Sequence, residues 1–415
     1  DLYMKILKRA KAILMTAVMM VTFTACGSKQ DNARKLDIEK NVTINIWYDD
    51  AAYSPYIEYV AQQLSAANEL LTVNPVFTDT DNYLDNVYKA AIGKADEQPS
   101  PDVYLINSDD LQKIYLTGIM AENDTYSSKY TTGLYGNAAI NACTYDGKLY
   151  GYPLSFNTGI MVYNKKYVTQ PDTFTNIAEY SNSYKVDDNN KDVQIITAWD
   201  STDMFLNYGF AAPYLNIGGT SSDDKNIADV DDSKLKEAMT GYAQLKNDYA
   251  LYTTTDENYC IDKFKNGNLI YTIIRSDRLS ELDDTDIDYG VCNIPDINSN
   301  LKSAAISTTD MAVVNPYSDN QEAAKTVAHA LSYDYAVDMY KYCKKPSVRN
   351  DCEFIKNADN YKALYSVYSD SVVKAQFVGA DEIYLRYELM IKKIWLGTPV
   401  NDAVTEFENM IKQRH

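Results

Sequence analysis

The stretch from Tyr145 to Lys165 constrains the possible folds more than any other part of this sequence. It opens with the turn signal Asp146-Gly147, which leads into a short aromatic strand and then a Gly-Tyr-Pro break at residues 151–153. A second apolar strand follows and ends at Asn164-Lys165. No helical pattern separates the two strands, which is typical of a chain that leaves one sheet and enters another. We interpret the stretch as the first crossing between two lobes.

Length and hydrophobic periodicity agree with two α/β lobes. At 415 residues the chain is too long for one ordinary core, and its 46% apolar content is enough for two. Strand patterns at 42–48, 71–77 and 102–106 alternate with helical patterns at 57–71 and 83–94. This alternation predicts crossover units and a largely parallel sheet. Ligands bind beyond the carboxyl ends of such strands.

The later part of the chain carries the remaining elements. Strands are predicted at 194–198, 269–274 and 303–314, and helices at 232–249, 260–266, 321–340, 361–368, 384–395 and 401–412. We interpret the strand at 303–314 as the return crossing and Lys344–Val348 as the third crossing. The expected N-terminal lobe is residues 41–153 plus 306–345, and the expected C-terminal lobe is residues 154–305 plus 346–415.

The N-terminal segment has the pattern of a lipoprotein secretion signal. With Met4 as the expected start, basic residues precede an apolar run, Ala12–Thr24, that is too short to span a membrane. Thr24-Ala25-Cys26-Gly27 resembles a lipoprotein cleavage site, at which Cys26 is lipidated. Residues 1–25 are thus the expected signal peptide, and residues 26–40 the lipidated cysteine and a polar tether. An ordinary secretion signal with an incidental Cys26 is the alternative.

Charge and histidine content limit the possible functions. The 58 acidic residues against 39 basic ones argue against nucleic acid as a partner. Only His329 and His415 exist, so a histidine-dependent triad or zinc cluster is hard to assemble. We expect no enzyme, no cofactor and no metal, and the acidic turn Asp283–Asp288 lacks the glycine and final glutamate of a calcium loop. A two-carboxylate glycosidase stays open, because distant carboxylates can meet in space.

Five cysteines remain after Cys26, and an odd count excludes a complete disulfide framework within one chain. Cys343 and Cys352 are close enough in sequence to pair. Buried free thiols are the state we expect for all five.

Several short motifs follow one another in an order that is more specific than any one of them. They are Pro101-Asp102-Val103-Tyr104 with Asp109, Gly118-Ile119-Met120-Ala121, Asp146-Gly147-Lys148-Leu149-Tyr150-Gly151 followed by Tyr163-Asn164-Lys165, Phe264-Lys265-Asn266-Gly267, Asp288-Tyr289-Gly290-Val291 before Ile294-Pro295, Asn320-Gln321-Glu322-Ala323-Ala324 and Leu396-Gly397. Over roughly residues 42–412 the chain resembles bacterial extracellular solute-binding proteins of the maltose-binding type. The resemblance implies a two-lobed α/β fold of the periplasmic-binding-protein type II kind, each lobe a mostly parallel sheet flanked by helices, with three hinge crossings.

The same resemblance implies a function and partners. Such a protein is an extracellular substrate-binding lipoprotein of an ABC importer that captures a sugar or oligosaccharide by hinge closure. Its implied partners are the sugar, the importer's permease subunits and the membrane, through a lipid on Cys26, and we expect a monomer. Alternatives are a non-sugar solute such as a peptide, amino acid, polyamine or anion, and a surface lipoprotein used for adhesion or sensing.

A sugar site needs aromatic plates for its apolar faces and polar side chains for its hydroxyl rim. Strand ends in the first lobe offer Trp47, Tyr48, Asp49, Asp50, Asn107 and Asp109. The second lobe offers Asn157, Trp199, Asp203, Phe205, Arg275, Asp277 and Tyr384.

The resemblance places a sugar-binding carboxylate at Asp109 and an aromatic plate at Tyr384. Asp109 has a competing interpretation as the cap of a helix from Leu111, and Trp47 as a core side chain. Trp395 we expect in the core. The family's common Asn-Gly-Pro-Trp is absent after Ile274, where Arg275-Ser276-Asp277 stands instead. Maltose specificity therefore does not transfer, and Arg275 keeps an anionic ligand open.

Overall fold

The computed structural model describes residues 38, 40–78, 81–93, 99–249, 255–352 and 358–413. The predicted signal peptide, Cys26 and nearly all of the predicted tether lie outside the described residues, as does His415. Within these ranges no helix combines the length and apolar character that crossing a membrane requires.

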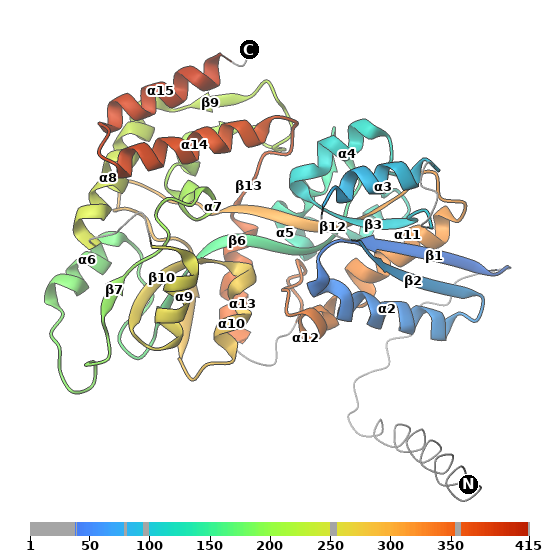
Figure 1. The fold of residues 1–415 in the computed structure, drawn as a ribbon, viewed down its shortest axis with the longest axis horizontal. Helices are drawn as coiled ribbons and strands as arrows, with labels where there is room; N and C mark the ends of the chain where they lie inside the picture. The colour runs from blue at the N-terminus through green and yellow to red at the C-terminus, as the bar shows by residue number, and fades with distance from the viewer. Residues whose placement is uncertain are drawn as a thin grey trace, which may run out of the picture. The chain divides into compact units, whose positions relative to one another are not determined.

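The first lobe is built on a sheet with helices on both faces (Figure 1). The strands β2 (Leu71–Phe77), β1 (Val42–Tyr48) and β3 (Val103–Asn107) are parallel, and β12 (Ile306–Val314) runs antiparallel to β3. The helices of this lobe are α2 (Ser54–Ala67), α3 (Tyr83–Ala91), α4 (Leu111–Thr117), α5 (Thr132–Ala142), α11 (Gln321–His329) and α12 (Met339–Cys343). A small hairpin, β4 (Thr144–Tyr145) and β5 (Lys148–Leu149), precedes the first crossing.

Two hydrophobic clusters hold this sheet, one on each face. Ile44 and Ile46 of β1 belong to the cluster that includes α2 and α11, whereas Trp47 belongs to the cluster that includes α3 and α4. Successive side chains of a strand point to opposite faces, so a strand covered on both sides is apolar nearly throughout. This explains why all three residues at 46–48 are buried.

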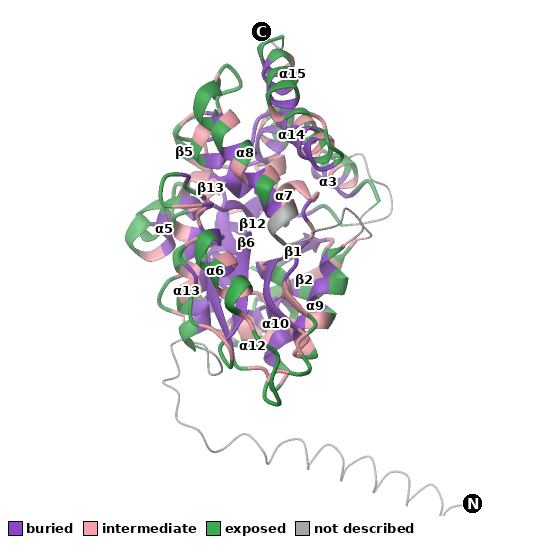
Figure 2. Ribbon diagram, turned by 90° about the vertical axis from the view of Figure 1, so that its left-hand side faces the viewer, coloured by how far each residue is buried: buried purple, intermediate pink, exposed green. Residues whose placement is uncertain are grey.

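The strand β6 (Tyr152–Asn164) passes from one lobe to the other, as predicted for the first crossing. Its first half pairs with β12 and its second half with β10 (Leu269–Arg275) and β11 (Tyr289–Cys292). The strand β12 returns beside it, and Ser347 bridges Ser155 in the third crossing. Figure 2 shows the buried residues concentrated along β6 and β12.

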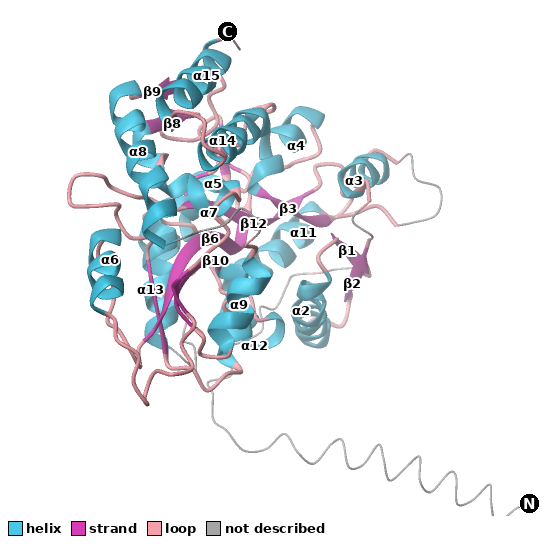
Figure 3. Ribbon diagram, turned by 60° about the vertical axis from the view of Figure 1, so that its left-hand side comes forward, coloured by secondary structure: helices cyan, strands magenta, loops and turns pink. Residues whose placement is uncertain are grey.

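The second lobe has a mixed sheet instead of the mostly parallel one that was expected. The strand β7 (Ile195–Thr197) is parallel to β10, but β6 runs antiparallel to both β10 and β11, because it enters from the first lobe. A short β13 (Val372–Val373) pairs with β12, and β8 (Leu215–Ile217) pairs with β9 (Ala228–Val230). The helices of this lobe are α6 (Phe174–Ser183), α7 (Met204–Asn207), α8 (Asp232–Tyr249), α9 (Glu257–Lys265), α10 (Ser280–Asp283), α13 (Ala358–Ser369), α14 (Ala380–Trp395) and α15 (Val400–Lys412). Figure 3 shows α6, α8 and α15 along its outer edge.

The single helix predicted over residues 321–340 is wrong. The α-helix α11 ends at His329, a π-helical segment follows at Ala330–Asp334, and α12 begins only at Met339. Tertiary contacts compete for this segment: the Ser332 hydroxyl donates to the Pro153 carbonyl, and the Tyr135 hydroxyl donates to the Ser332 carbonyl. Such competition with the helical ladder is a usual cause of a break.

The prediction of free thiols is confirmed for these five cysteines, and the prediction of burial for four of them. Cys143, Cys260, Cys292 and Cys343 are buried free thiols, and Cys352 is a half-buried one. Cys343 and Cys352 do not pair.

Candidate ligand-binding cavity

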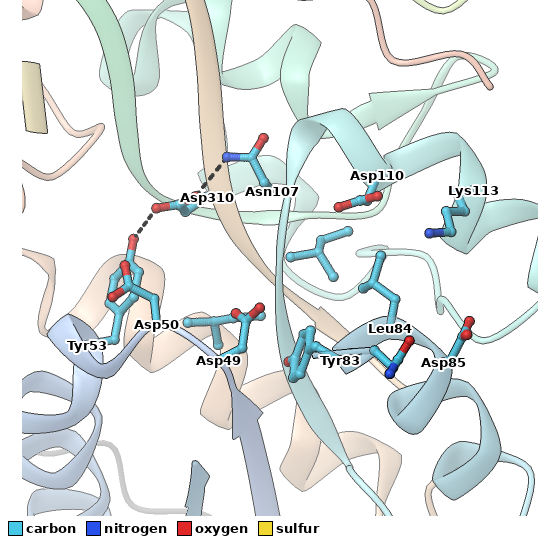
Figure 4. A pocket seen from close by; sticks show the side chains of 13 residues that line it. Asp49, Asp50, Tyr53, Tyr83, Leu84, Asp85, Asn107, Asp110, Lys113 and Asp310 are labelled. Atoms are coloured by element: carbon cyan, nitrogen blue, oxygen red, sulfur yellow. Dashed lines mark hydrogen bonds between the residues drawn. The ribbon is translucent and has the colours of Figure 1, made fainter. Parts of the chain in front are cut away.

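A cavity of about 420 Å³ lies beyond the carboxyl ends of β1 and β3 (Figure 4). This is where parallel α/β sheets bind their ligands. The residues that line it are Asp49, Asp50, Tyr53, Asn82, Tyr83, Leu84, Asp85, Leu105, Ile106, Asn107, Asp110, Lys113 and Asp310. All but Asp310 belong to the first lobe's strand ends and adjoining helices, and Asp310 belongs to the crossing strand β12.

Local hydrogen bonds shape the walls of the cavity. The Asp50 carboxylate accepts the Ala52 amide at 2.9 Å and starts a short turn that carries Tyr53. The Asn107 side chain accepts the Asp109 amide at 3.1 Å and ends β3 in the same way. Short polar side chains favour such turns, because they replace the hydrogen bonds that the strand no longer provides. The polar strand ends therefore fold towards the cavity.

Asp310 is the centre of the polar network in the cavity floor. Its carboxylate accepts the Tyr53 hydroxyl at 2.8 Å and the Asn107 side-chain amide at 2.9 Å. The register of β12 against β6 shifts directly after Asp310, and such a bulge redirects a side chain. Lys345 of the third crossing adds a positive charge, with its Nζ 2.8 Å from Asp50 Oδ2 and 3.8 Å from Asp310 Oδ2.

Two other carboxylates of the cavity, Asp49 and Asp110, have no salt-bridge partner among the described residues. Burial raises the pKa of Asp49; its own backbone amide partly offsets this, and neighbouring carboxylates add to it. Burial also raises the pKa of Asp110, against the opposing charge of Lys113. Partly buried carboxylates without a salt-bridge partner can accept hydrogen bonds from a bound ligand. The cavity can therefore accept hydrogen bonds from hydroxyl or ammonium groups.

The residues predicted from the second lobe form a network of their own. The Arg275 guanidinium contacts Asp203 Oδ2 at 2.6 Å and Glu257 Oε2 at 2.7 Å, and it lies 5.5 Å from the centre of the Phe205 ring. Both sides of the guanidinium fork are therefore occupied by carboxylates, which leaves it poorly placed for an anionic ligand. Glu257 was missed because nothing in α9 marks its side chain as pointing towards β10.

Asn157 and Asp277 extend this network towards the crossing strands. The Asn157 amide donates to Asp277 Oδ2 at 2.9 Å, and its oxygen accepts the Ser276 hydroxyl at 3.1 Å. Burial raises the pKa of Asp277, and the positive charge of Lys345 opposes that shift. Asp277 is thus electrostatically coupled to the lysine that contacts Asp50 and Asp310.

Comparison with known proteins identifies the family. A family model described as a bacterial extracellular solute-binding protein matches residues 60–363. The chain belongs to this family. It is 22% identical over 99% of its length to the maltodextrin-binding protein MdxE of Bacillus subtilis (strain 168), all of which is covered. It is 25% identical over 76% of its length, and 75% of the relative's, to a maltooligosaccharide ABC transporter solute-binding lipoprotein of Streptococcus pneumoniae serotype 4 (strain ATCC BAA-334 / TIGR4).

Solved structures agree on the fold. An extracellular solute-binding protein from Staphylococcus aureus, in complex with maltose, matches with a TM-score of 0.75 at 18% identity, over 91% of this chain and 98% of that one. A cyclo/maltodextrin-binding protein in complex with maltotetraose matches with a TM-score of 0.77 at 15% identity, with the same coverage of the two chains. The predicted two-lobed type II fold with three crossings is confirmed.

The aromatic plates expected of this solute-binding protein at 47, 48 and 199 are core residues instead. Trp47 is 2% exposed and donates its indole N–H to the Pro99 carbonyl at 3.1 Å. Tyr48 is 2% exposed and packs on Phe77. Trp199 is fully buried and donates to Asn207 Oδ1 at 2.8 Å. Because Trp395 is buried as predicted, none of the chain's three tryptophans has a face open to a ligand.

Asp109 and Tyr384 are both engaged by Lys374, which sequence reasoning missed. Lys374 Nζ lies 2.6 Å from Asp109 Oδ2 and 5.3 Å from the centre of the Tyr384 ring. Tyr384 is 3% exposed, so its predicted role as an open plate is wrong in this conformation. The capping alternative for Asp109 is also wrong, because α4 begins after Asp110 without a side-chain cap.

No group of side chains suited to a metal ion occurs in the described ranges. The acidic turn at 283–288 has a structural role at its first residue. Asp283 is buried, and its carboxylate accepts the Tyr289 hydroxyl at 2.6 Å and the Tyr361 hydroxyl at 3.0 Å.

Proposed function

We propose that this solute-binding protein captures a sugar or short oligosaccharide and delivers it to the membrane subunits of an ABC importer. The observation that carries the proposal is the cavity at the strand ends, where the carboxylates of Asp49 and Asp110 lie with the Asn107 amide. Carboxylates accept hydrogen bonds from the hydroxyl rim of a sugar, and a side-chain amide both donates and accepts them. The maltodextrin and maltooligosaccharide named for its relatives belong to this ligand class.

Hinge closure completes the site in this proposal. The cavity lining comes from the first lobe and β12, while Asn157 and Asp277 of the second lobe stand near the same crossings. Bending at the three crossings brings these groups onto the ligand. Superimposable small-angle scattering profiles with and without a tight ligand would rule out closure.

The proposed location is the outer face of the cell membrane, with a lipid on Cys26. A diacylglyceryl group supplies the two chains that stable anchoring needs. The closed pair of lobes then presents one surface to the permease, which needs only a monomer. Replacing Cys26 with Ala should release the protein into the medium, and native mass spectrometry of the released form should show one chain.

The proposed role involves no covalent chemistry, so the ligand leaves unchanged. Its test is prolonged incubation with the tightest oligosaccharide, followed by chromatography of the sugar. Hydrolysis that disappears when a cavity carboxylate is changed to its amide would favour a two-carboxylate glycosidase instead.

The main test is a thermal-shift screen of the soluble form that begins at residue 27. Monosaccharides and oligosaccharides are compared with amino acids, peptides and polyamines. A ligand at 100 times its dissociation constant adds about 2.7 kcal/mol to the free energy of unfolding, which is easily measured. Stabilisation by one sugar series supports the proposal, and stabilisation by none of the sugars removes it.

A second candidate ligand is a cationic solute such as a polyamine. Asp49 and Asp110 favour it, because both carboxylates line the cavity and neither forms a salt bridge within the described part of the chain. The two ligand classes differ in their response to salt. Polyamine affinity should fall steeply as ionic strength rises, whereas affinity for a neutral sugar should not.

A further inference from the structure

Lys374 reaches from the second lobe to the first. It follows β13 in the segment that leads to α14, and its Nζ contacts Asp109 Oδ2 at 2.6 Å and Asp381 Oδ1 at 3.0 Å. Asp109 follows the first-lobe strand β3, whereas Asp381 lies in the first turn of α14. The lysine therefore joins a strand end of one lobe to a helix start of the other.

The ammonium group of Lys374 occupies the space between a carboxylate and an aromatic ring. Lys374 is 8% exposed, and its Nζ lies over the ring of Tyr384. A carboxylate facing an aromatic ring is the pair of groups that holds a sugar ring, through its hydroxyls and its apolar face. In this protein an internal side chain fills that space.

One oxygen of Asp109 remains without a hydrogen bond. Asp109 Oδ1 is buried and has no hydrogen-bond partner among the described residues, while Oδ2 accepts from Lys374. Buried acceptor atoms are rarely left without a hydrogen bond, so each such atom needs an explanation. The unbonded Asp109 Oδ1 is explained if this place is a subsite that accepts hydrogen bonds from a hydroxyl group. Lys374 satisfies only one of its two acceptor oxygens.

The open cavity and Lys374 are neighbours. Asp110 lines the cavity, follows Asp109 directly, and feels the charges of both Lys374 and Asp381. Backbone contacts fix the lysine in place, since its amide donates to the Ser307 carbonyl at 2.9 Å. Burial lowers the pKa of Lys374, but Asp109 and Asp381 outweigh it, so the side chain stays charged.

We propose that Lys374 is a specificity-determining residue, which closes the subsite between Asp109 and Tyr384 and restricts the ligand to what the open cavity holds. This rests on the proposed sugar-binding function. Short sugars then bind fully in the cavity, and additional rings contribute no affinity because their place is taken. A volume of about 420 Å³ is at the small end of ligand cavities, in agreement with a short ligand.

Lys374→Met tests the proposal, with Lys325→Met as a matched control. Both lysines are 8% exposed and lie 2.6 Å from an aspartate oxygen, but Lys325 pairs with Asp124 instead of with Asp109 beside the cavity. Affinities are measured by calorimetry for maltooligosaccharides and galactooligosaccharides of one to four rings. We expect no gain beyond the short sugars in the wild type and in Lys325→Met. In Lys374→Met the affinity for the longest sugar should rise at least tenfold relative to the disaccharide.

The outcomes separate the two proposals. An unchanged length preference in folded Lys374→Met overturns the role of Lys374 and leaves sugar binding intact, as does loss of all sugar binding in that variant alone. The proposed role of Lys374 is also overturned if the wild type already prefers longer sugars. If no sugar binds to any of the three proteins, the proposed function itself fails, and this proposal with it. Lys374→Ala, which removes the side chain from the space between Asp109 and Tyr384, carries the same expectation if Lys374→Met does not fold.

Discussion

The cavity lining of the first lobe, here the first wall, and the Arg275 network of the second lobe, here the second wall, contain the same kinds of charged side chain but use them differently. In the first lobe, Asp49 and Asp110 line the cavity and form no salt bridge with any described residue. In the second lobe, Asp203 and Glu257 both bind Arg275. A charged group satisfied within the protein contributes to stability, whereas an unsatisfied one is available to a ligand. The difference predicts that changes in one wall alter stability and changes in the other alter binding.

The largest expected effect is on stability in the second lobe. Arg275→Ala leaves Asp203 without its cation and Glu257 with only the more distant Arg278, and should lower the free energy of unfolding by about 2–3 kcal/mol. Sugar affinity of the folded protein should change little. Chemical denaturation and calorimetry measure the two quantities.

Arg386→Ala is the control for that variant, because Arg386 pairs with Glu382 one turn away on a helix surface. Arg386→Ala should lower the free energy of unfolding by about 0.5 kcal/mol. If Arg275→Ala instead abolished binding at unchanged stability, Arg275 would be a ligand contact. The comparison between the two walls would then be wrong.

The next effect is on binding in the first lobe. Asp110→Asn should weaken sugar binding by about 1–3 kcal/mol, because a buried hydroxyl of the ligand loses a charged acceptor. The free energy of unfolding should not fall. Asp85→Asn is the control, since Asp85 lines the cavity but is exposed, and water can replace its contact. If the two variants weakened sugar binding equally, Asp110 would not be a direct ligand contact.

Much of the fold could be predicted from local patterns. The strand β1 and the helix α8 have the predicted bounds, Val42–Tyr48 and Asp232–Tyr249, because hydrophobic periodicity alone determines such elements. The break after His329 could not be predicted in this way. It depends on Ser332 meeting Pro153, a residue far away in the chain.

The residues of the candidate site also fall into those that local patterns predict and those that depend on distant contacts. The strand-end rule placed Asp49, Asp50 and Asn107 in the cavity lining, since it needs only the ends of strands. It could not find Lys345, whose role depends on how the crossings lie side by side. Asp310 did carry a signal, because it is the one acidic residue within the apolar strand β12. Trp47 was misplaced because periodicity does not tell which strand face a helix will cover.

The pH dependence of binding distinguishes the two walls further. Burial raises the pKa of Asp49 and Asp110 above the ordinary 3.8. The carboxylate accepts stronger hydrogen bonds from a sugar than the protonated carboxyl group does, so affinity should be full above the raised pKa and fall as the pH drops through it. The loss should therefore begin at a higher pH than an ordinary aspartate would give. Calorimetry across the acidic range measures this, and Asp110→Asn should flatten the profile.

The smallest effect is on the stability of the free protein. The folded-state pKa of Asp49 lies above its unfolded value, so its carboxylate opposes folding at neutral pH, and this opposition disappears as the pH falls through the raised pKa. Asp49→Asn removes the charge and should raise the free energy of unfolding at pH 7. The gain should not exceed about 0.5 kcal/mol, because the side chain is half exposed and solvent screens it. The gain should vanish near pH 3.8, where the wild-type carboxyl is protonated as well. A loss of stability at pH 7 would instead assign Asp49 to the protein's internal network, like Arg275, and the first wall would then differ from the second only in Asp110.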